Sequence, residues 1–212
     1  MFDLDLSTLI ARAIVLLIAF TIHELAHAVT ADWLGDPTPR RMGRITLNPL
    51  AHLDPMGTIA LLVAGFGWAK PVMVNPMNMR GNPRSAMAIV AAAGPASNLV
   101  MAVLFAMPFR FGLVNLAGIF SGSSVLPSVP YLLFEFVWIN LILMLFNLIP
   151  IPPLDGYKIL TGILPPEMSY SLRPLEQYGF IILLAVVFLV PSVLGFLVVQ
   201  PAQSVFSFLV GF

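Results

Sequence analysis

No cysteine occurs in the 212-residue sequence, and charged side chains are scarce. The absence of cysteine excludes disulfides, thiolate metal ligands and a cysteine nucleophile, and it leaves the redox compartment undetermined. Asp, Glu, Lys and Arg make up 9% of the residues, which is too few to cover the surface of a water-soluble globular protein of this size. The formal net charge is zero, so the charge balance gives no indication of a nucleic-acid or acidic partner.

Long apolar runs dominate instead, since 59% of the residues are hydrophobic and the mean hydropathy is +0.96. The runs are continuous rather than alternating, which predicts an all-α polytopic membrane protein and not a β-barrel. The N-terminal stretch MFDLDLSTLI is acidic where a signal peptide is basic, so we expect it to remain in the mature protein. We expect one membrane-embedded domain over residues 1–212, with its core at 6–162 and further helices within 172–212.

About five transmembrane helices are predicted in this domain. Their expected ranges are 6–33, 86–108, 130–149, 175–190 and 193–210, with Pro191 dividing the last two. Residues 34–55 are polar and rich in turn signals, which is typical of a surface loop. The short apolar run 56–67 suits a re-entrant segment better than a full crossing. Residues 71–76 are bounded by prolines and are predicted to form a small β-hairpin or edge strand.

The basic residues of the loops predict the orientation in the membrane. If 56–67 dips in and returns, the loops 34–55, 68–84 and 155–173 lie on one side. These loops hold eight basic residues, namely Arg40, Arg41, Arg44, Lys70, Arg80, Arg84, Lys158 and Arg173. The opposite loops hold Arg110. We therefore expect a multi-pass protein of the cell membrane with its N-terminus outside and its polar loops in the cytoplasm.

The segment FTIHELAHAV places two histidines and a glutamate in the cytoplasmic half of the first predicted helix. Residues four apart share a helix face, so His23 and His27 can direct their imidazoles at one ion with Glu24 beside it. This H-E-x-x-H pattern is the zinc metalloprotease signature, in which the glutamate is the general base. The alternative is that both histidines are only hydrogen-bonded within the bundle. Ionisable residues inside a membrane favour the functional interpretation.

A catalytic zinc ion usually takes three protein ligands. Without cysteine, the third must be His52 or a carboxylate. Asp155 in FNLIPIPPLDG is the best carboxylate, because prolines break the helix before it and Gly156 permits a sharp turn after it. Its alternative role is that of a helix N-cap. The remaining candidates are expected near the opposite face or in loops and helix ends: Glu135, Asp32, Asp36 and Asp54.

Three motifs occur in order: HELAH, AAAGPASN at 91–98 and NLIPIPPLDG at 147–156. Together they resemble the site-2 protease family of intramembrane zinc metalloproteases, over about residues 15–162. The segments GDPTPRRMGRITLNPLAHLDPMGT and GWAKPVMVNP are similar to its small prokaryotic branch without PDZ domains. The resemblance implies that His23, His27 and Asp155 bind one Zn²⁺ per chain and that Glu24 is the catalytic base. It also implies cleavage in or next to a transmembrane segment of membrane-protein substrates, known as regulated intramembrane proteolysis. This chain reads PPLDG where some branches read NPDG, but the Asp-Gly pair is retained.

Other residues have a functional and a structural interpretation. Small residues such as Gly94 let helices approach closely, so Asn98 could bind a substrate carbonyl or oxyanion, or form an interhelical hydrogen bond. Interhelical bonding is the favoured role of Asn140 and Asn147. Val72 and Val74 could lie on an edge to which an extended substrate adds, or the segment could serve packing alone.

His52 in NPLAHLDP is either a solvated loop residue or a gating or auxiliary residue near the metal. Two rival functions use similar residues: an ion or metal transporter, and a catalytically silent substrate-binding protein with the same fold. A transporter predicts polar residues through both halves of the bundle, whereas here they gather toward one side. Intact His23, Glu24 and His27 argue against the silent protein.

Overall fold

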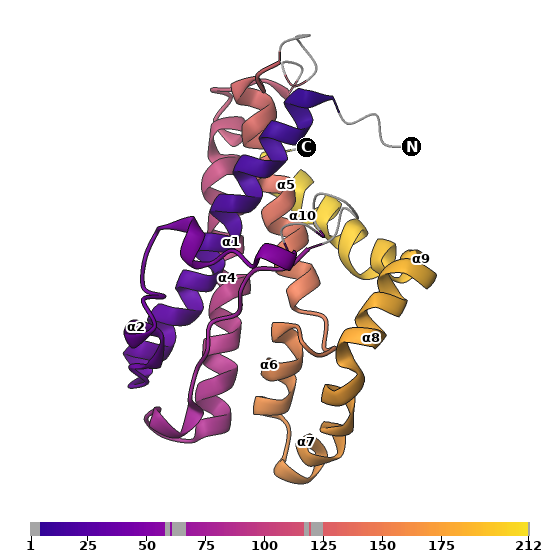
Figure 1. The fold of residues 1–212 in the computed structure, drawn as a ribbon. Helices are drawn as coiled ribbons and strands as arrows, with labels where there is room; N and C mark the ends of the chain where they lie inside the picture. The colour runs from indigo at the N-terminus through magenta and orange to yellow at the C-terminus, as the bar shows by residue number, and fades with distance from the viewer. Residues whose placement is uncertain (1–4, 58–59, 61–66, 117–118, 120–124, 212) are drawn as a thin grey trace.

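The computed structural model describes residues 5–57, 60, 67–116, 119 and 125–211, and these are largely helical (Figure 1). Four helical segments are long and apolar enough to cross a membrane: α1 (Leu6–Leu34), α4 (Pro83–Arg110), α5 (Val129–Asn147) and the segment Pro191–Val210. The last comprises α9 (Pro191–Leu194), a π-helical stretch (Gly195–Val199) and α10 (Gln200–Val210). The helices α7 (Pro166–Leu172) and α8 (Pro174–Leu189) meet at 51° and give a fifth span if they cross as one.

Capping groups mark ends of the long helices α1 and α4. Asp5 accepts a hydrogen bond from the Thr8 N–H at the start of α1, and Gly35 ends this helix in the left-handed conformation at φ 111°. Asn82 accepts from the Arg84 N–H at the start of α4. Each predicted apolar helix is present in the structure with slightly different ends.

Helix α4 lies at the centre of the bundle, where it contacts α1, α5 and α6 (Asp155–Ile163) (Figure 1). Its buried positions include small residues such as Ala91, Gly94 and Ala102, which let backbones approach closely. One apolar core lies between α4, α5 and α10 and contains Ala102, Ala106, Phe109, Val137, Leu141, Met144, Ala202 and Val210. The helix that carries AAAGPASN is therefore packed directly on the helix that carries HELAH.

The predicted β-hairpin is wrong for the described residues, which contain no strand beyond an isolated antiparallel bridge between Leu53 and Ala69. Residues 71–75 are not in a helix or strand and lead into a 3₁₀ turn at Pro76–Asn78. The N–H groups of Val72 and Asn75 donate to side chains, Glu24 and Asp36, instead of a neighbouring strand. The re-entrant prediction falls mainly on residues 58–59 and 61–66, which lie outside the described residues.

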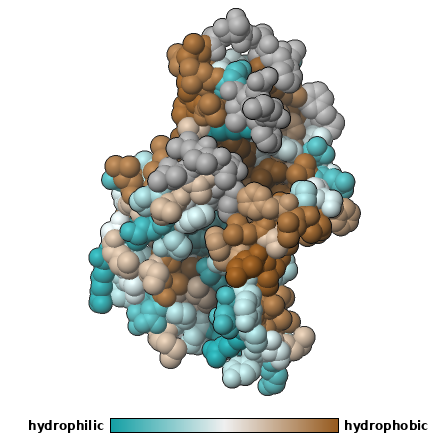
Figure 2. Space-filling view, turned by 45° about the vertical axis from the view of Figure 1, so that its right-hand side comes forward, coloured by the Kyte–Doolittle hydropathy of each residue, from teal (hydrophilic) through white to brown (hydrophobic). Residues whose placement is uncertain are grey.

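Hydrophilic side chains are unevenly distributed on the face of the molecule that Figure 2 shows. In Figure 2, most hydrophilic side chains of the visible face lie in the lower half, and hydrophobic ones predominate above. The lower half is the level at which Figure 1 shows α2 (Thr38–Arg41), α6 and α7.

Candidate metal centre

Two helices bring three ligand atoms together in the interior. His23 and His27 lie one turn apart on α1, and Asp155 is the first residue of α6. The Nε2 atoms of the histidines lie 3.1 Å apart, and each lies 3.1 Å from Oδ2 of Asp155. Ligand atoms on a tetrahedral zinc ion with bonds of ~2.0 Å are separated by ~3.3 Å. The observed triangle therefore has the size of one face of a zinc site.

The loop after α5 determines where Asp155 lies. Residues 148–154 are rich in proline, and a Cβ on Gly156 would lie 2.2 Å from the carbonyl oxygen of Leu148. Only glycine lets the first turn of α6 pack this tightly against the loop. The N-cap of α6 is Leu154 and not Asp155, whose carboxylate faces the histidines through Oδ2. Its other oxygen, Oδ1, lies 3.6 Å from Nζ of Lys158.

Hydrogen bonds fix which nitrogen of each histidine carries the proton. The Nδ1 atom of His27 lies 2.7 Å from the carbonyl oxygen of Val90. A carbonyl oxygen only accepts, so Nδ1 carries the hydrogen, and in the neutral imidazole Nε2 then has a free lone pair.

His23 is fixed through a longer chain of hydrogen bonds. Asn140 donates from Nδ2 to the carbonyl oxygen of Phe136 at 2.8 Å, which turns its Oδ1 toward Asn98. Asn98 donates from Nδ2 to that oxygen at 2.8 Å, and its own Oδ1 lies 2.6 Å from Nδ1 of His23. The Nδ1 atom of His23 must therefore be the donor, which in the neutral imidazole leaves Nε2 without a hydrogen.

Two bare nitrogens and a carboxylate oxygen thus converge in a buried space. Their residues, His23, His27 and Asp155, are 6%, 8% and 5% exposed. Lone pairs that face one another without hydrogens between them repel, and a cation removes this repulsion. Nitrogen and oxygen donors in this number and spacing suit zinc. The residues present fit the metal on geometry and on protonation.

Gly94 lies directly against this space. A Cβ at this position would lie 2.4 Å from Nε2 of His27 and 2.5 Å from Nε2 of His23. Val90, Gly94 and Asn98 are four residues apart, so one face of α4 supplies a carbonyl for His27, an open position and an amide for His23. The Oδ1 and Nδ2 atoms of Asn98 are both hydrogen-bonded to other helices, to His23 of α1 and Asn140 of α5, so this side chain forms interhelical hydrogen bonds.

Glu24 lies outside the group of described residues whose ligand atoms fall within 4.8 Å of one another. Its Oε2 accepts a hydrogen bond from the Val72 N–H at 3.0 Å, and Nη2 of Arg44 lies 3.8 Å from the same oxygen. The glutamate is 9% exposed and follows His23 directly in α1. Glu24 thus follows a predicted ligand directly in the chain and lies outside the ligand group, a position that suits a general base.

Arg44 was not identified as a site residue from the sequence. It is 4% exposed, and burial lowers the pKa of its guanidinium, an effect that the Glu24 carboxylate opposes. Three arginines occur within five residues of the loop, and nothing in the sequence distinguishes the buried one. Arg40 instead forms an ion pair with Asp32.

Asp36 was expected to be a loop residue, yet it is fully buried. Its carboxylate accepts hydrogen bonds from the Thr38 N–H and hydroxyl, the Asn75 N–H and the Asn78 amide. Burial alone raises the pKa of this carboxyl, but these hydrogen bonds outweigh it and the pKa is lowered. Asp36 thereby ties the end of α1 to the segment that contacts Glu24.

The other residues singled out from the sequence lie elsewhere. His52 is fully buried, does not belong to the metal group, and donates from Nε2 to the carbonyl oxygen of Thr46 at 2.9 Å. Val74 packs on the apolar cluster of Ala31, Met79, Ala86 and Val90, in agreement with a packing role. Asn140 bonds to Asn98 across helices as expected, whereas Asn147 donates to Leu143 of its own helix.

Glu135 belongs to a separate cluster near the first turns of α1 and α5. Its Oε1 accepts from the Tyr131 hydroxyl at 2.8 Å and lies 3.3 Å from Nε of Arg12. The Tyr131 hydroxyl is 3.0 Å from that of Thr8. This cluster joins the two helices away from the metal residues, so Glu135 does not compete as a ligand.

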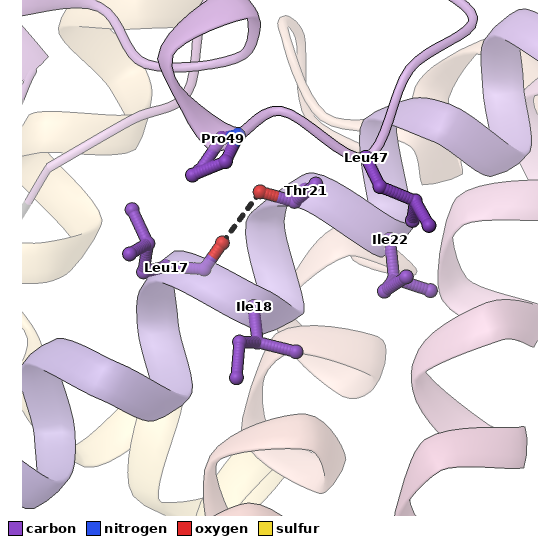
Figure 3. A pocket seen from close by; sticks show the side chains of 6 residues that line it. All are labelled: Leu17, Ile18, Thr21, Ile22, Leu47 and Pro49. Atoms are coloured by element: carbon purple, nitrogen blue, oxygen red, sulfur yellow. Dashed lines mark hydrogen bonds between the residues drawn. The ribbon is translucent and has the colours of Figure 1, made fainter.

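An apolar pocket lies between α1 and the following loop, apart from the metal residues. Figure 3 shows its lining: Leu17, Ile18, Thr21, Ile22, Leu47 and Pro49. The one hydroxyl in this lining, that of Thr21, donates to the carbonyl oxygen of Leu17 at 2.6 Å. The lining offers no titratable group for chemistry.

Comparison with known proteins gives a consistent result. The family model described as "Peptidase family M50" matches residues 110–191, which include Asp155. The Bacillus subtilis protein named "Putative zinc metalloprotease YwhC" is 44% identical over 192 residues, which is 89% of this chain and 83% of the relative.

More distant relatives carry the name "Putative zinc metalloprotease Rip2". The protein from Mycolicibacterium smegmatis is 33% identical over 178 residues, 78% of this chain and 62% of the relative. The Mycobacterium tuberculosis protein is 33% identical over 187 residues, 84% of this chain and 66% of the relative. The chain thus spans about two thirds of the length of these two proteins. No solved structure matches the chain.

Proposed function

This chain belongs to peptidase family M50, and from that premise we propose that it hydrolyses a peptide bond in or next to a transmembrane segment of membrane-protein substrates. Its zinc metalloprotease relatives and its apolar helices make it a zinc metallopeptidase of the membrane. The observation that carries the proposal is the convergence of two bare histidine nitrogens and one aspartate oxygen beside Glu24.

In the proposed site, His23, His27 and Asp155 would hold one zinc ion per chain. A bound zinc ion supplies Lewis acidity, which polarises a peptide carbonyl and acidifies an attacking water. Asn98 and the Val90 carbonyl orient the two imidazoles, so their Nε2 lone pairs need no rearrangement when the metal binds. Gly94 keeps the space in front of them open.

Glu24 is assigned the proton transfers. Its carboxylate takes a proton from the attacking water and delivers it to the nitrogen of the leaving amine. The Val72 N–H that holds Oε2 orients this side chain before substrate arrives. A carboxylate that the Val72 N–H holds in place suits a base that must first accept a proton and then donate it within one turnover.

A substrate helix hides its peptide bonds, so it must unwind locally before cleavage. Residues 71–75 pass next to Glu24, and an extended substrate lying along them would reach the site. We propose that Val72 lies along the path of the substrate, whereas Val74 serves packing. Val74 is packed in an apolar cluster, whereas the Val72 backbone contacts the catalytic base itself.

The orientation follows from the loop charges. We propose that the N-terminus lies outside the cell and that the site opens toward the cytoplasm, in a multi-pass protein of the cell membrane. Polar side chains gather at the end of the molecule that holds α2, α6 and α7, and water enters a membrane site most easily from such an end (Figure 2). A single domain over residues 1–212 accommodates all of these parts.

The test is cleavage of a single-span substrate reconstituted in liposomes, with zinc content measured on the same samples. Wild type is expected to cleave, and Glu24→Gln is expected to keep its zinc while losing activity by about 10²-fold or more. Glu167→Gln, an exposed glutamate of α7, is the matched control and should behave as wild type. Equal cleavage by zinc-loaded Glu24→Gln would remove Glu24 from the mechanism.

A further inference from the structure

Arg44 connects two loop segments, and one of them leads to the backbone position that contacts Glu24. Its guanidinium donates from Nη1 to the carbonyl oxygen of Ala51 at 2.7 Å and from Nη2 to the carbonyl oxygen of Lys70. The neighbouring Arg41 is exposed, so burial distinguishes Arg44 within the same loop. A buried guanidinium that bonds two backbone carbonyls fixes the distance between their segments.

Further contacts make this connection rigid. The Lys70 N–H donates to the carbonyl oxygen of His52 at 2.8 Å, and Leu53 forms an antiparallel bridge with Ala69. The His52 ring is fully buried and donates to the carbonyl oxygen of Thr46. Lys70 is therefore held through both its N–H and its carbonyl, two residues before Val72.

These contacts lead from Arg44 and Lys70 to the carboxylate of Glu24. The Val72 N–H reaches Oε2 at 3.0 Å, and Nη2 of Arg44 lies 3.8 Å from the same atom. A buried arginine is stabilised by a nearby anion, and Glu24 supplies this charge. Both contacts engage one oxygen of the carboxylate.

We propose that Arg44 is a positioning residue for Glu24. It holds the segment from Lys70 to Val72 so that the Val72 N–H fixes Oε2, and it adds a positive charge on the same side. The other oxygen, Oε1, is thereby left for proton transfer. This assignment of Oε1 rests on the proposed function, whereas the dependence of the contact between Val72 and Glu24 on Arg44 does not.

Hydrogen exchange at the Val72 amide tests that dependence in the purified full-length protein in detergent, with no substrate present. Arg44→Gln is expected to accelerate exchange by at least about tenfold, the effect of losing a hydrogen bond to a charged group. Glu24→Ala, which removes the acceptor, should accelerate it similarly. Arg41→Gln is the matched control and should exchange as wild type. Wild-type protection of Val72 in Arg44→Gln would overturn the proposal.

Cleavage kinetics separate positioning from a structural role. Arg44→Gln is expected to lower kcat by about tenfold or more, with KM and zinc content near wild-type values. If Arg44→Gln does not fold, Arg44→Lys carries the test, because lysine keeps the charge but lacks the planar fork that bonds two carbonyls. Faster Val72 exchange in Arg44→Lys supports the proposal, and wild-type exchange overturns it. Failure of wild type to cleave any substrate would refute the proposed function and leave the exchange result standing.

Discussion

The Nδ1 atom of His23 lies 2.6 Å from Oδ1 of Asn98, across the interface between α1 and α4. This contact links a residue of HELAH to a residue of AAAGPASN. Because Asn98 is itself oriented by Asn140 on α5, three helices determine the direction of one lone pair. The metal site is therefore built into the packing of the bundle.

Replacing Asn98 by leucine should weaken zinc binding. The change removes the acceptor for the Nδ1 hydrogen of His23, so the imidazole loses its fixed tautomer and orientation. Outer partners of metal-bound histidines typically contribute about 10–100-fold in affinity, and we expect a loss in this range. Competition with a chelator of known affinity measures it.

The matched control for this substitution is Asn147→Leu, because Asn147 bonds a carbonyl of its own helix. Its zinc affinity should stay within about threefold of wild type, because a residue that does not interact with the metal site should change the affinity little beyond experimental scatter. Equal affinities for the Asn98 and Asn147 variants would show that Asn98 does not act on the metal site.

Gly94→Ala should abolish metal binding while the rest of the bundle stays folded. Its new methyl group would lie 2.4 Å from Nε2 of His27, where the ligand atoms converge. Zinc content and circular dichroism report the two effects separately. At Gly195 an added Cβ would meet no other described part of the chain within 4 Å, so Gly195→Ala should keep full zinc content. A fully loaded Gly94→Ala protein would place the metal elsewhere.

Asp36 should contribute stability that is lost in acid. Its folded-state pKa is lowered, so the contribution is complete above the unfolded-state value of about 3.9 and disappears as the pH falls through the folded-state value. We expect the thermal midpoint of wild type in detergent to fall below about pH 4.

Asp36→Asn should lower the free energy of unfolding at neutral pH by about 1–3 kcal/mol, because the NH₂ group of asparagine cannot accept the hydrogen bonds that a carboxylate oxygen accepts. The substitution should also flatten the loss of stability below about pH 4. Asp32→Asn, which breaks the pair with the exposed Arg40, is the control and should cost less than about 1 kcal/mol. An unchanged acid profile in Asp36→Asn would refute the assignment.

Sequence patterns could predict the parts of this molecule that depend on local chemistry. Hydropathy located the long helices, the spacing of His23 and His27 placed them on one face, and the prolines before Asp155 indicated a break that brings a carboxylate inward. Contacts between distant segments were beyond these patterns. Val72 and Asn75 were predicted in an edge strand, but their N–H groups bond to the side chains of Glu24 and Asp36.

Burial was likewise hard to predict from composition. Arg44 sits among exposed arginines and differs from them in its burial and in its contacts with Ala51, Lys70 and Glu24. His52 looked like a loop residue or an auxiliary ligand, and it is an interior residue outside the metal group. Because a polar loop has no hydrophobic periodicity, its sequence does not show which of several arginines is buried.

Zinc stoichiometry and affinity of the full-length protein test the central claim, that His23, His27 and Asp155 form one metal site. Wild type should bind one zinc ion per chain. Asp155→Ala should bind it more than about hundredfold more weakly, because a lost ligand exceeds the effect of an outer partner. Glu167→Ala should match wild type. Zinc binding by Asp155→Ala with wild-type affinity would contradict the account.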